Sequence, residues 1–237
     1  KIERALQIND QDAVSYVILG NIFFELHRPF ESKEKFDEPL AMYQQAVTLD
    51  PKYVSAHNGV GNVLFERAKA FGTLEDFDAA REAFSKALSL DPNSAYAING
   101  MGYVNTEHSQ QIKEETMLDR GIDYFLKANQ LEPSNDNIIE NLGVAYMYKS
   151  EYQLAAEEKE KFLKLAEERL IEVRNLGGST YNLACLYANV GEKQKALQML
   201  EEALNLDRET LHYIEKDREW NPYRDDHDFQ QLLATYA

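Results

Sequence analysis

The stretch Tyr16-Val17-Ile18-Leu19-Gly20-Asn21-Ile22-Phe23 decides the fold, because its small residue returns along the chain at a fixed interval. The small residues that share this 41-residue step are Gly20, Gly61, Gly102, Gly143 and Ala184. Two further landmarks keep the same step, an alanine (Ala46, Ala87, Ala128) and a proline after an acidic residue (Pro51, Pro92, Pro133). Three landmarks with one spacing indicate an internal repeat, and periods of about 20 to 50 residues are typical of solenoids.

Each repeat is predicted to hold two amphipathic helices, because apolar residues recur at helical spacing in two bursts. In the first repeat the bursts are Tyr16, Leu19, Gly20 and Phe23, and then Phe36, Leu40, Tyr43, Ala46 and Val47. The glycine and alanine landmarks have a packing reason, since two helices approach closely only where the side chain between them is small. The proline ends the second helix, because it lacks a backbone donor and biases its predecessor out of helix. One pair cannot bury its apolar face alone, so the pairs are expected to stack into an all-α solenoid.

These residues resemble the tetratricopeptide repeat, whose pattern is aromatic-x-x-Leu-Gly-x-x-Tyr, then Ala, an aromatic residue, Ala and Pro. Residues 16–23 fit the first half of the pattern, and residues 80–88 with Asp91-Pro92 fit the second half. The resemblance covers residues 1–207 and implies a right-handed solenoid of helical hairpins. The 41-residue period departs from the usual 34 residues of that family.

The repeat frame predicts a single domain over residues 1–237, with five helix pairs and a cap. Its parts are a partial repeat at 1–12, repeats at 13–53, 54–94, 95–135, 136–176 and 177–210, and a C-terminal cap at 211–237. Residues 1–8 read as the tail of an earlier second helix, with Ala5 at the closing-alanine place, so the segment is expected to belong to a longer parent. In the fourth repeat the added length is expected in a long second helix from about Tyr152 to Asn175.

The C-terminal segment resembles the one that closes many bacterial repeat arrays attached to kinases and cyclases. The resemblance rests on residues 214–224, which contain Trp220, and on residues 229–233, which begin with Phe229. A last repeat must cover its exposed apolar face. We therefore expect the two rings and Leu232 to pack over the last helix pair, around Leu197, Leu200 and Leu204.

Composition excludes several classes of function. With 25 basic and 41 acidic residues, the 237-residue chain has a formal net charge of −16, which argues against nucleic acid as a partner. The 44% hydrophobic content is that of a folded chain, and no apolar run or charged-then-apolar leader predicts a membrane span or signal peptide. With one cysteine, Cys185, no internal disulfide is possible, which is compatible with the cytoplasm.

No motif points to catalysis, so we expect no enzyme, no cofactor and no metal. The five histidines (His27, His57, His108, His212 and His227) lack metal-ligand spacing, and one cysteine cannot form a thiolate cluster. There is no phosphate loop, nucleophile elbow or dinucleotide fingerprint. Cys185 stands beside a small residue on a helix and is expected to be an inert buried thiol.

The family resemblance implies that the first helix of each pair lines a concave face. Counted from the small residue, the inward places lie three residues before it and one, four and five residues after it. They are Val17, Asn21, Phe24 and Glu25; Asn58, Asn62, Phe65 and Glu66; Asn99, Tyr103, Thr106 and Glu107; and Glu140, Val144, Met147 and Tyr148. Asn141 and Asn182, just before the leucine, occupy a place similar to the asparagine ladder of sugar-transferring repeat enzymes.

These places predict an asparagine row, an aromatic row (Phe24, Phe65, Tyr103, Tyr148) and a glutamate row (Glu25, Glu66, Glu107). An asparagine offers a donor and an acceptor to the backbone of an extended peptide, and glutamates favour a basic ligand side chain. The first hypothesis is therefore a non-catalytic scaffold for a neutral to basic protein or peptide. The alternatives are a solvated face without a ligand, a regulatory or sensor domain of a larger signalling protein, and a self-associating module. The oligomeric state and the partner's identity stay open.

Overall fold

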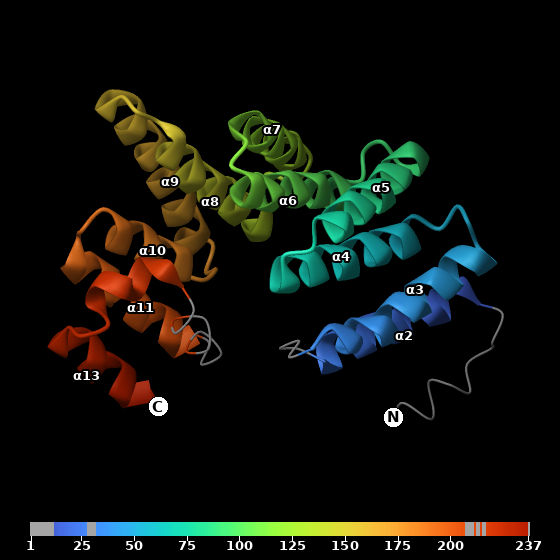
Figure 1. The fold of residues 1–237 in the computed structure, drawn as a ribbon, viewed down its shortest axis with the longest axis horizontal. Helices are drawn as coiled ribbons and strands as arrows, with labels where there is room; N and C mark the ends of the chain where they lie inside the picture. Colours follow the sequence, from blue (N-terminus) through green and yellow to red (C-terminus); the bar gives the residue numbers. More distant parts are fainter. Residues whose placement is uncertain (1–11, 28–31, 207–210, 212–213, 215–216, 237) are drawn as a thin grey trace. The chain divides into compact units, whose positions relative to one another are not determined.

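The fold is described from a computed structural model, in which residues 12–27, 32–206, 211, 214 and 217–236 are placed (Figure 1). Within these ranges the secondary structure is helical and contains no strand, as the sequence predicts. The expected partial repeat at 1–12 lies outside the described residues except for Asp12. The chain divides into two compact units, unit 1 (Lys1–Leu131) and unit 2 (Glu132–Ala237).

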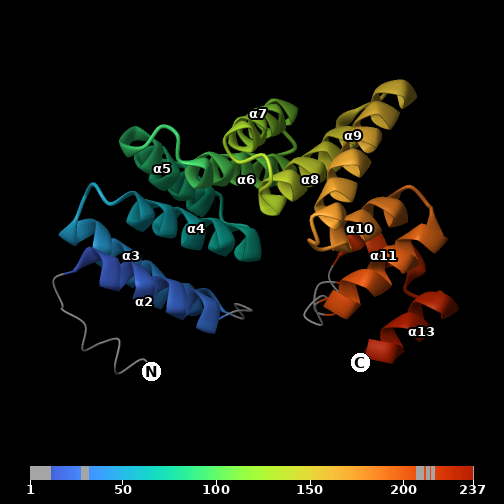
Figure 2. The ribbon, with the colours of Figure 1, turned by 180° about the vertical axis from the view of Figure 1, so that it is seen from behind.

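The described residues of unit 1 form three helical hairpins that follow one another along the chain. Its elements are α2 (Ala13–Leu26), η1 (Lys33–Phe36), α3 (Asp37–Leu49), α4 (Val54–Phe71), α5 (Leu74–Leu90), α6 (Ala95–Ile112) and α7 (Glu115–Leu131). Helices α2 and α3, α4 and α5, and α6 and α7 pack as pairs, visible from both sides in Figures 1 and 2. Helix α3 also packs on α4, and α5 on α6, so the three hairpins stack.

The helix ends follow from local hydrogen bonding. The Asp12 carboxylate accepts from the backbone N–H groups of Val14 and Ser15 at the start of α2. At the other end of a hairpin, Asp50 Oδ1 accepts from the N–H of Lys52 across Pro51, which closes a turn directly after α3. The aspartate-proline landmark therefore ends the second helix, as predicted.

The glycine landmarks make room for one ring per hairpin. A Cβ added to Gly20 or Gly59 would lie 2.8 or 2.2 Å from the ring of Tyr43, which sits between α2 and α4. Phe84 holds the same position between Gly61 and Gly100, where an added Cβ would lie 2.9 or 2.5 Å from its ring. The closing alanines Ala46, Ala87 and Ala128 are fully buried. The small residues are thus close helix contacts, which is the packing reason inferred from the sequence.

In the described part of unit 2, two hairpins are followed by a terminal helical segment. Its elements are α8 (Asp136–Tyr152), α9 (Ala156–Asn175), α10 (Tyr181–Asn189), α11 (Lys193–Leu206), η2 (Arg218–Tyr223) and α13 (His227–Tyr236). Helix α8 pairs with α9 and α10 with α11, while η2 lies on α10 and α13 on α11. No helix in the described part of the chain combines the length and the apolar character that a membrane span needs.

The long second helix of the fourth repeat ends at Asn175 as expected, but it begins at Ala156 and not at Tyr152. Helix α8 continues through Tyr152 and has 17 residues, so it is no longer than α4 and α6 with 18 each. Helix α9 has 20 residues against 17 in α5 and α7, so the added length lies in the second helix, as expected. Leu170 packs on Gly143 and follows it by 27 residues, whereas Tyr43 follows Gly20 by 23. The inserted length before this contact is therefore four residues, about one helical turn, which returns the contacting side chain to the same helix face.

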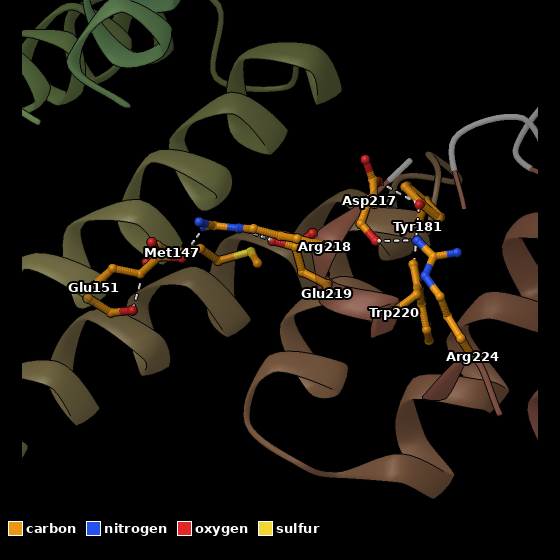
Figure 3. A network of polar contacts seen from close by, with 9 residues as sticks. Met147, Glu151, Tyr181, Asp217, Arg218, Glu219, Trp220 and Arg224 are labelled. Atoms are coloured by element: carbon orange, nitrogen blue, oxygen red, sulfur yellow. Dashed lines mark hydrogen bonds and ion pairs between the residues drawn. The ribbon is translucent and has the colours of Figure 1, made fainter. Parts of the chain in front are cut away.

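The terminal segment packs on the last hairpin as the sequence predicts. Trp220 is 0% exposed, and its ring stacks on Phe229 with the centroids 5.3 Å apart. Its cluster includes Leu197, Leu200, Leu204 and Leu232. The indole Nε1 donates to Tyr181 Oη at 3.3 Å, and that hydroxyl donates to Asp217 Oδ2 at 2.6 Å. Tyr181 of α10 thus binds the polar end of the indole ring, and Asp217, near Trp220 in the sequence, binds Tyr181 (Figure 3).

Cys185 lies in the same cluster and is buried, as predicted for an inert thiol. Burial raises the pKa of its thiol, and the nearby carboxylates of Asp217 and Glu219 raise it further. The side chain therefore stays protonated, and the nucleophilic thiolate does not form at neutral pH.

Candidate peptide-binding surface

The place four residues after the small residue belongs to the core, which corrects part of the sequence-based site. Phe24 and Phe65 are 4% and 3% exposed, so neither ring presents a face to a ligand. Phe65 lies 6.2 Å from Phe77, between ring centroids, in the second helix of its own hairpin. Thr106 at the same place points at Gly121 of α7, where an added Cβ would lie 2.4 Å from Thr106 Oγ1. This place faces the partner helix of the hairpin.

The accessible places are those one and five residues after the small residue. At the place three residues before it, Asn99 is partly exposed, whereas Val17 and the predicted site residue Asn58 are buried. The three places follow one another at four-residue spacing and share one helix face. In unit 1 the exposed or partly exposed members are Asn21, Glu25, Asn62, Glu66, Asn99, Tyr103 and Glu107, which we call the first-helix face. The three helices that carry them, α2, α4 and α6, are in contact in this order. The asparagine and glutamate rows therefore occupy neighbouring helices in unit 1.

The asparagines of this face differ in what they already bind. Asn21 Oδ1 accepts a hydrogen bond from Tyr43 Oη at 2.6 Å, so this side chain also holds the ring of its hairpin. Asn58 is 9% exposed and lies one turn before Asn62, and its Oδ1 is buried without a hydrogen-bond partner among the described residues. An unpaired buried acceptor costs free energy. Asn58 therefore lies beside the first-helix face with an unsatisfied buried oxygen, and it is not itself an exposed member of that face.

The glutamate row concentrates negative charge. Burial raises the pKa of Glu107, the ammonium of Lys69 lowers it, and the carboxylate of Glu66 raises it again. Glu66 on α4 and Glu107 on α6 therefore interact across two neighbouring helices. Lys69 is not among the residues predicted from the sequence. Its position one turn after Glu66 on α4 is the sequence feature that could have indicated its interaction with the glutamate row.

In unit 2 the predicted site residues differ in their exposure and do not form one surface row. Asn141 is buried in α8, so it is not available at the surface, and Tyr148 is partly exposed. Asn182 Nδ2 donates to Glu140 Oε1 at 2.9 Å. Burial raises the pKa of Glu140, the Asn182 hydrogen bond lowers it, and Asp136 raises it. Sequence reasoning placed Asn182 and Glu140 on first helices but did not pair them.

The described residues contain no group of three His, Cys, Asp or Glu side chains that could hold a metal ion. The side chains of the first-helix face are amides, carboxylates and one phenol. Amides offer donors and acceptors to a peptide backbone, and carboxylates attract cationic side chains. This arrangement can recognise a ligand by hydrogen bonds and charge.

Replacing Glu107 with Gln is expected to raise the melting temperature at neutral pH. The pKa of the Glu107 carboxyl is higher in the folded chain than in the unfolded chain. The native state therefore becomes less stable as the pH rises from the unfolded pKa to the folded pKa, because ionisation costs more free energy in the folded chain. The gain from the amide should therefore shrink as pH falls toward the ordinary glutamate range, where Glu107 becomes protonated. Thermal melts at several pH values check this, with Glu82→Gln, exposed on α5, as a charge-matched control. Equal responses of the two variants would contradict the role given to Glu107.

Two family models described as tetratricopeptide repeat match the chain, one at residues 61–94 and one at residues 179–210. Among solved structures, the thermophilic protein TTC0263 of Thermus thermophilus has a TM-score of 0.66 at 15% identity, covering 94% of this chain and 96% of that one. PilF of Pseudomonas aeruginosa has a TM-score of 0.57 at 19% identity, covering 94% of this chain and 88% of that one. MamA has a TM-score of 0.50 at 18% identity, covering 73% of this chain and 86% of that one. No curated protein sequence matches the chain.

Proposed function

Because this chain belongs to the tetratricopeptide repeat superfamily, we propose that it is a protein-interaction scaffold that binds an extended peptide on the first-helix face of unit 1. The observation that carries the proposal is the glutamate row. Glu25, Glu66 and Glu107 stand at one place of three successive first helices, and the last two carboxylates interact. A peptide with basic side chains relieves this like-charge repulsion, whereas an acidic peptide adds to it.

The amides supply the part of recognition that does not depend on the peptide's sequence. Asn62 and Asn99 lie on neighbouring helices α4 and α6, and each offers a donor and an acceptor to a main chain. Asn58 gains a hydrogen bond for its buried oxygen when its side chain turns toward a ligand N–H. The ligand is thus a neutral to basic segment, held by its backbone at the amides and by its charge at the carboxylates.

Charge reversal tests the proposal with a defined probe. The probe is a set of immobilised nine-residue peptides of equal length and apolar content that carry either Lys and Arg or Asp and Glu. We expect the native chain to prefer the basic peptides at physiological ionic strength. The variant Glu25→Lys, Glu66→Lys, Glu107→Lys should lose at least about tenfold in affinity for them, which corresponds to about 1.4 kcal/mol.

The control changes the net charge equally on the second helices. Glu75, Glu82 and Asp123 are exposed on α5 and α7, and their replacement by Lys should leave the preference for basic peptides largely intact. Circular dichroism establishes that both triple variants keep their helix content. If the control loses binding as much as the first-helix variant does, attraction comes from overall charge and the first-helix face is not the site.

A further inference from the structure

His108 is a buried histidine of α6 that contacts the second helix of the preceding hairpin. The residue is 7% exposed, and its ring stacks on that of Phe77 in α5 with the centroids 5.1 Å apart and an interplanar angle of 7°. Its Nδ1 lies 2.9 Å from Nη2 of Arg81, which is also in α5. The same histidine therefore takes part in the packing of α5 on α6 and in a hydrogen bond between the two helices.

The hydrogen bond to Arg81 determines the protonation state of His108. A guanidinium is always charged in proteins and has no acceptor, so Arg81 donates and Nδ1 of His108 accepts. The ring is therefore neutral and carries its proton on Nε2. A proton added at Nδ1 removes this acceptor and places a second positive charge beside the guanidinium.

The charged groups around His108 act in opposite directions, and their net effect together with burial opposes protonation. Burial lowers the pKa of His108, the Arg81 guanidinium lowers it further, and the carboxylates of Asp78 in α5 and Glu114 before α7 raise it. Asp78 also pairs with Arg81, whose Nη1 donates to Asp78 Oδ1 at 2.5 Å. Glu107, the neighbour of His108 in the sequence, lies about 100° away around α6 and belongs to the first-helix face.

We propose that His108 makes the contact between the second and third hairpins of unit 1 sensitive to protons in the mildly acidic range. At neutral pH the neutral ring accepts from Arg81 and stacks on Phe77, and α5 packs on α6. When His108 takes up a proton, the hydrogen bond is lost and two cations repel each other within the contact, which weakens it. This inference is independent of the ligand proposed for the first-helix face.

The effect of this proton on stability has a definite sign. The pKa of His108 is lower in the folded chain than in the unfolded chain, so the unfolded chain binds more protons between the two values. The free energy of unfolding therefore falls as the pH drops from the ordinary histidine pKa of about 6.5 toward the folded value. Above the ordinary value, the stability that the neutral ring contributes is fully present.

A nuclear magnetic resonance titration of the full chain tests the contact. The Cε1 proton of His108, identified by its nuclear Overhauser contacts to the Phe77 ring, should titrate at a lower pH than a histidine in a short unstructured peptide. Arg81→Met removes the cation and the donor and should raise the titration midpoint. The control Lys86→Met removes an equal charge from an exposed place on the same helix and should leave the midpoint nearly unchanged. A native midpoint at or above the peptide value, or equal midpoints in the two variants, would overturn the proposal.

Urea melts measure the effect on stability. Between about pH 7.5 and about pH 5 the native chain should lose stability, and His108→Gln, which cannot take up this proton, should lose less. The matched control is His57→Gln, because His57 is 8% exposed but its Nε2 donates to the backbone oxygen of Pro51 at 2.9 Å, a bond that protonation of Nδ1 leaves in place. This variant should keep the pH dependence of the native chain. An equal loss of stability in the native chain and in His108→Gln would show that His108 is not the proton-sensitive group.

Discussion

Replacing Trp220 with Ala is expected to lower the free energy of unfolding by about 3–5 kcal/mol, the range for removing a large buried aromatic side chain. The indole is fully buried in the cluster of unit 2, stacks on Phe229 and donates to Tyr181 Oη. Its loss leaves a cavity under η2 and removes a partner from a hydroxyl that also binds Asp217. Urea and thermal melts measure the effect.

The control for this variant is Leu206→Ala, because Leu206 is exposed on α11 and its truncation should change stability by less than about 0.5 kcal/mol. Trp220 is the only tryptophan, so its fluorescence reports the cap alone. The native emission should be blue-shifted and should move to the red on unfolding. A native emission already at the red limit and open to a soluble quencher would contradict the buried cap.

The burial of Trp220 could be predicted from the need to cover the last helix pair, although its neighbours in the sequence are polar. The apolar face of a helix pair needs a cover, and this segment carries large apolar side chains such as Trp220 and Phe229. The sequence could not show which groups the polar neighbours of Trp220 bind. In the structure Asp217 accepts from Tyr181 Oη and from the Arg224 guanidinium through its backbone oxygen, and Arg218 pairs with Glu151 of α8 (Figure 3).

The candidate site was predicted less completely, for a geometric reason. Helical periodicity gives the direction of a side chain around its own axis, but the neighbouring helix that covers that direction is set by tertiary packing. Glu25 and Phe24 are adjacent in sequence and differ by about 100° around α2, which places one outside and the other in the core. The aromatic row was therefore assigned to the surface when Phe24 and Phe65 belong to the hairpin interior.

The boundary between the two helices of the fourth repeat was also not fixed by sequence spacing. Sequence spacing placed the extra residues in the second helix, and α9 with 20 residues is indeed longer than α5 and α7 with 17 each. It put the start of that helix near Tyr152, however, which is too early. The structure continues α8 to Tyr152, begins α9 at Ala156 and brings Leu170 onto Gly143. An insertion of about one turn keeps the helix face and is therefore nearly invisible to periodicity.

Replacing Ala87 with Phe is expected to lower the free energy of unfolding by about 1–3 kcal/mol through overpacking. Ala87 is fully buried in the core cluster of α4, α5 and α6, and Ala46 holds the same place one repeat earlier. Because α5 packs on both α4 and α6, a ring at residue 87 must separate helices that approach closely at Gly61 and Gly100. Thermal melts of Ala87→Phe and Ala46→Phe measure the cost.

The matched control is Ala41→Phe, since Ala41 is exposed on the same helix as Ala46 and its replacement adds the same ring to the same element. Its free energy of unfolding should lie within about 0.5 kcal/mol of that of the parent chain. The comparison separates the volume added in the core from the lower helix propensity of phenylalanine, which both variants share. If Ala46→Phe and Ala41→Phe melt alike, the closing alanines are not helix contacts, and the repeat frame that assigns every other position, including Glu66 and Glu107, is wrong.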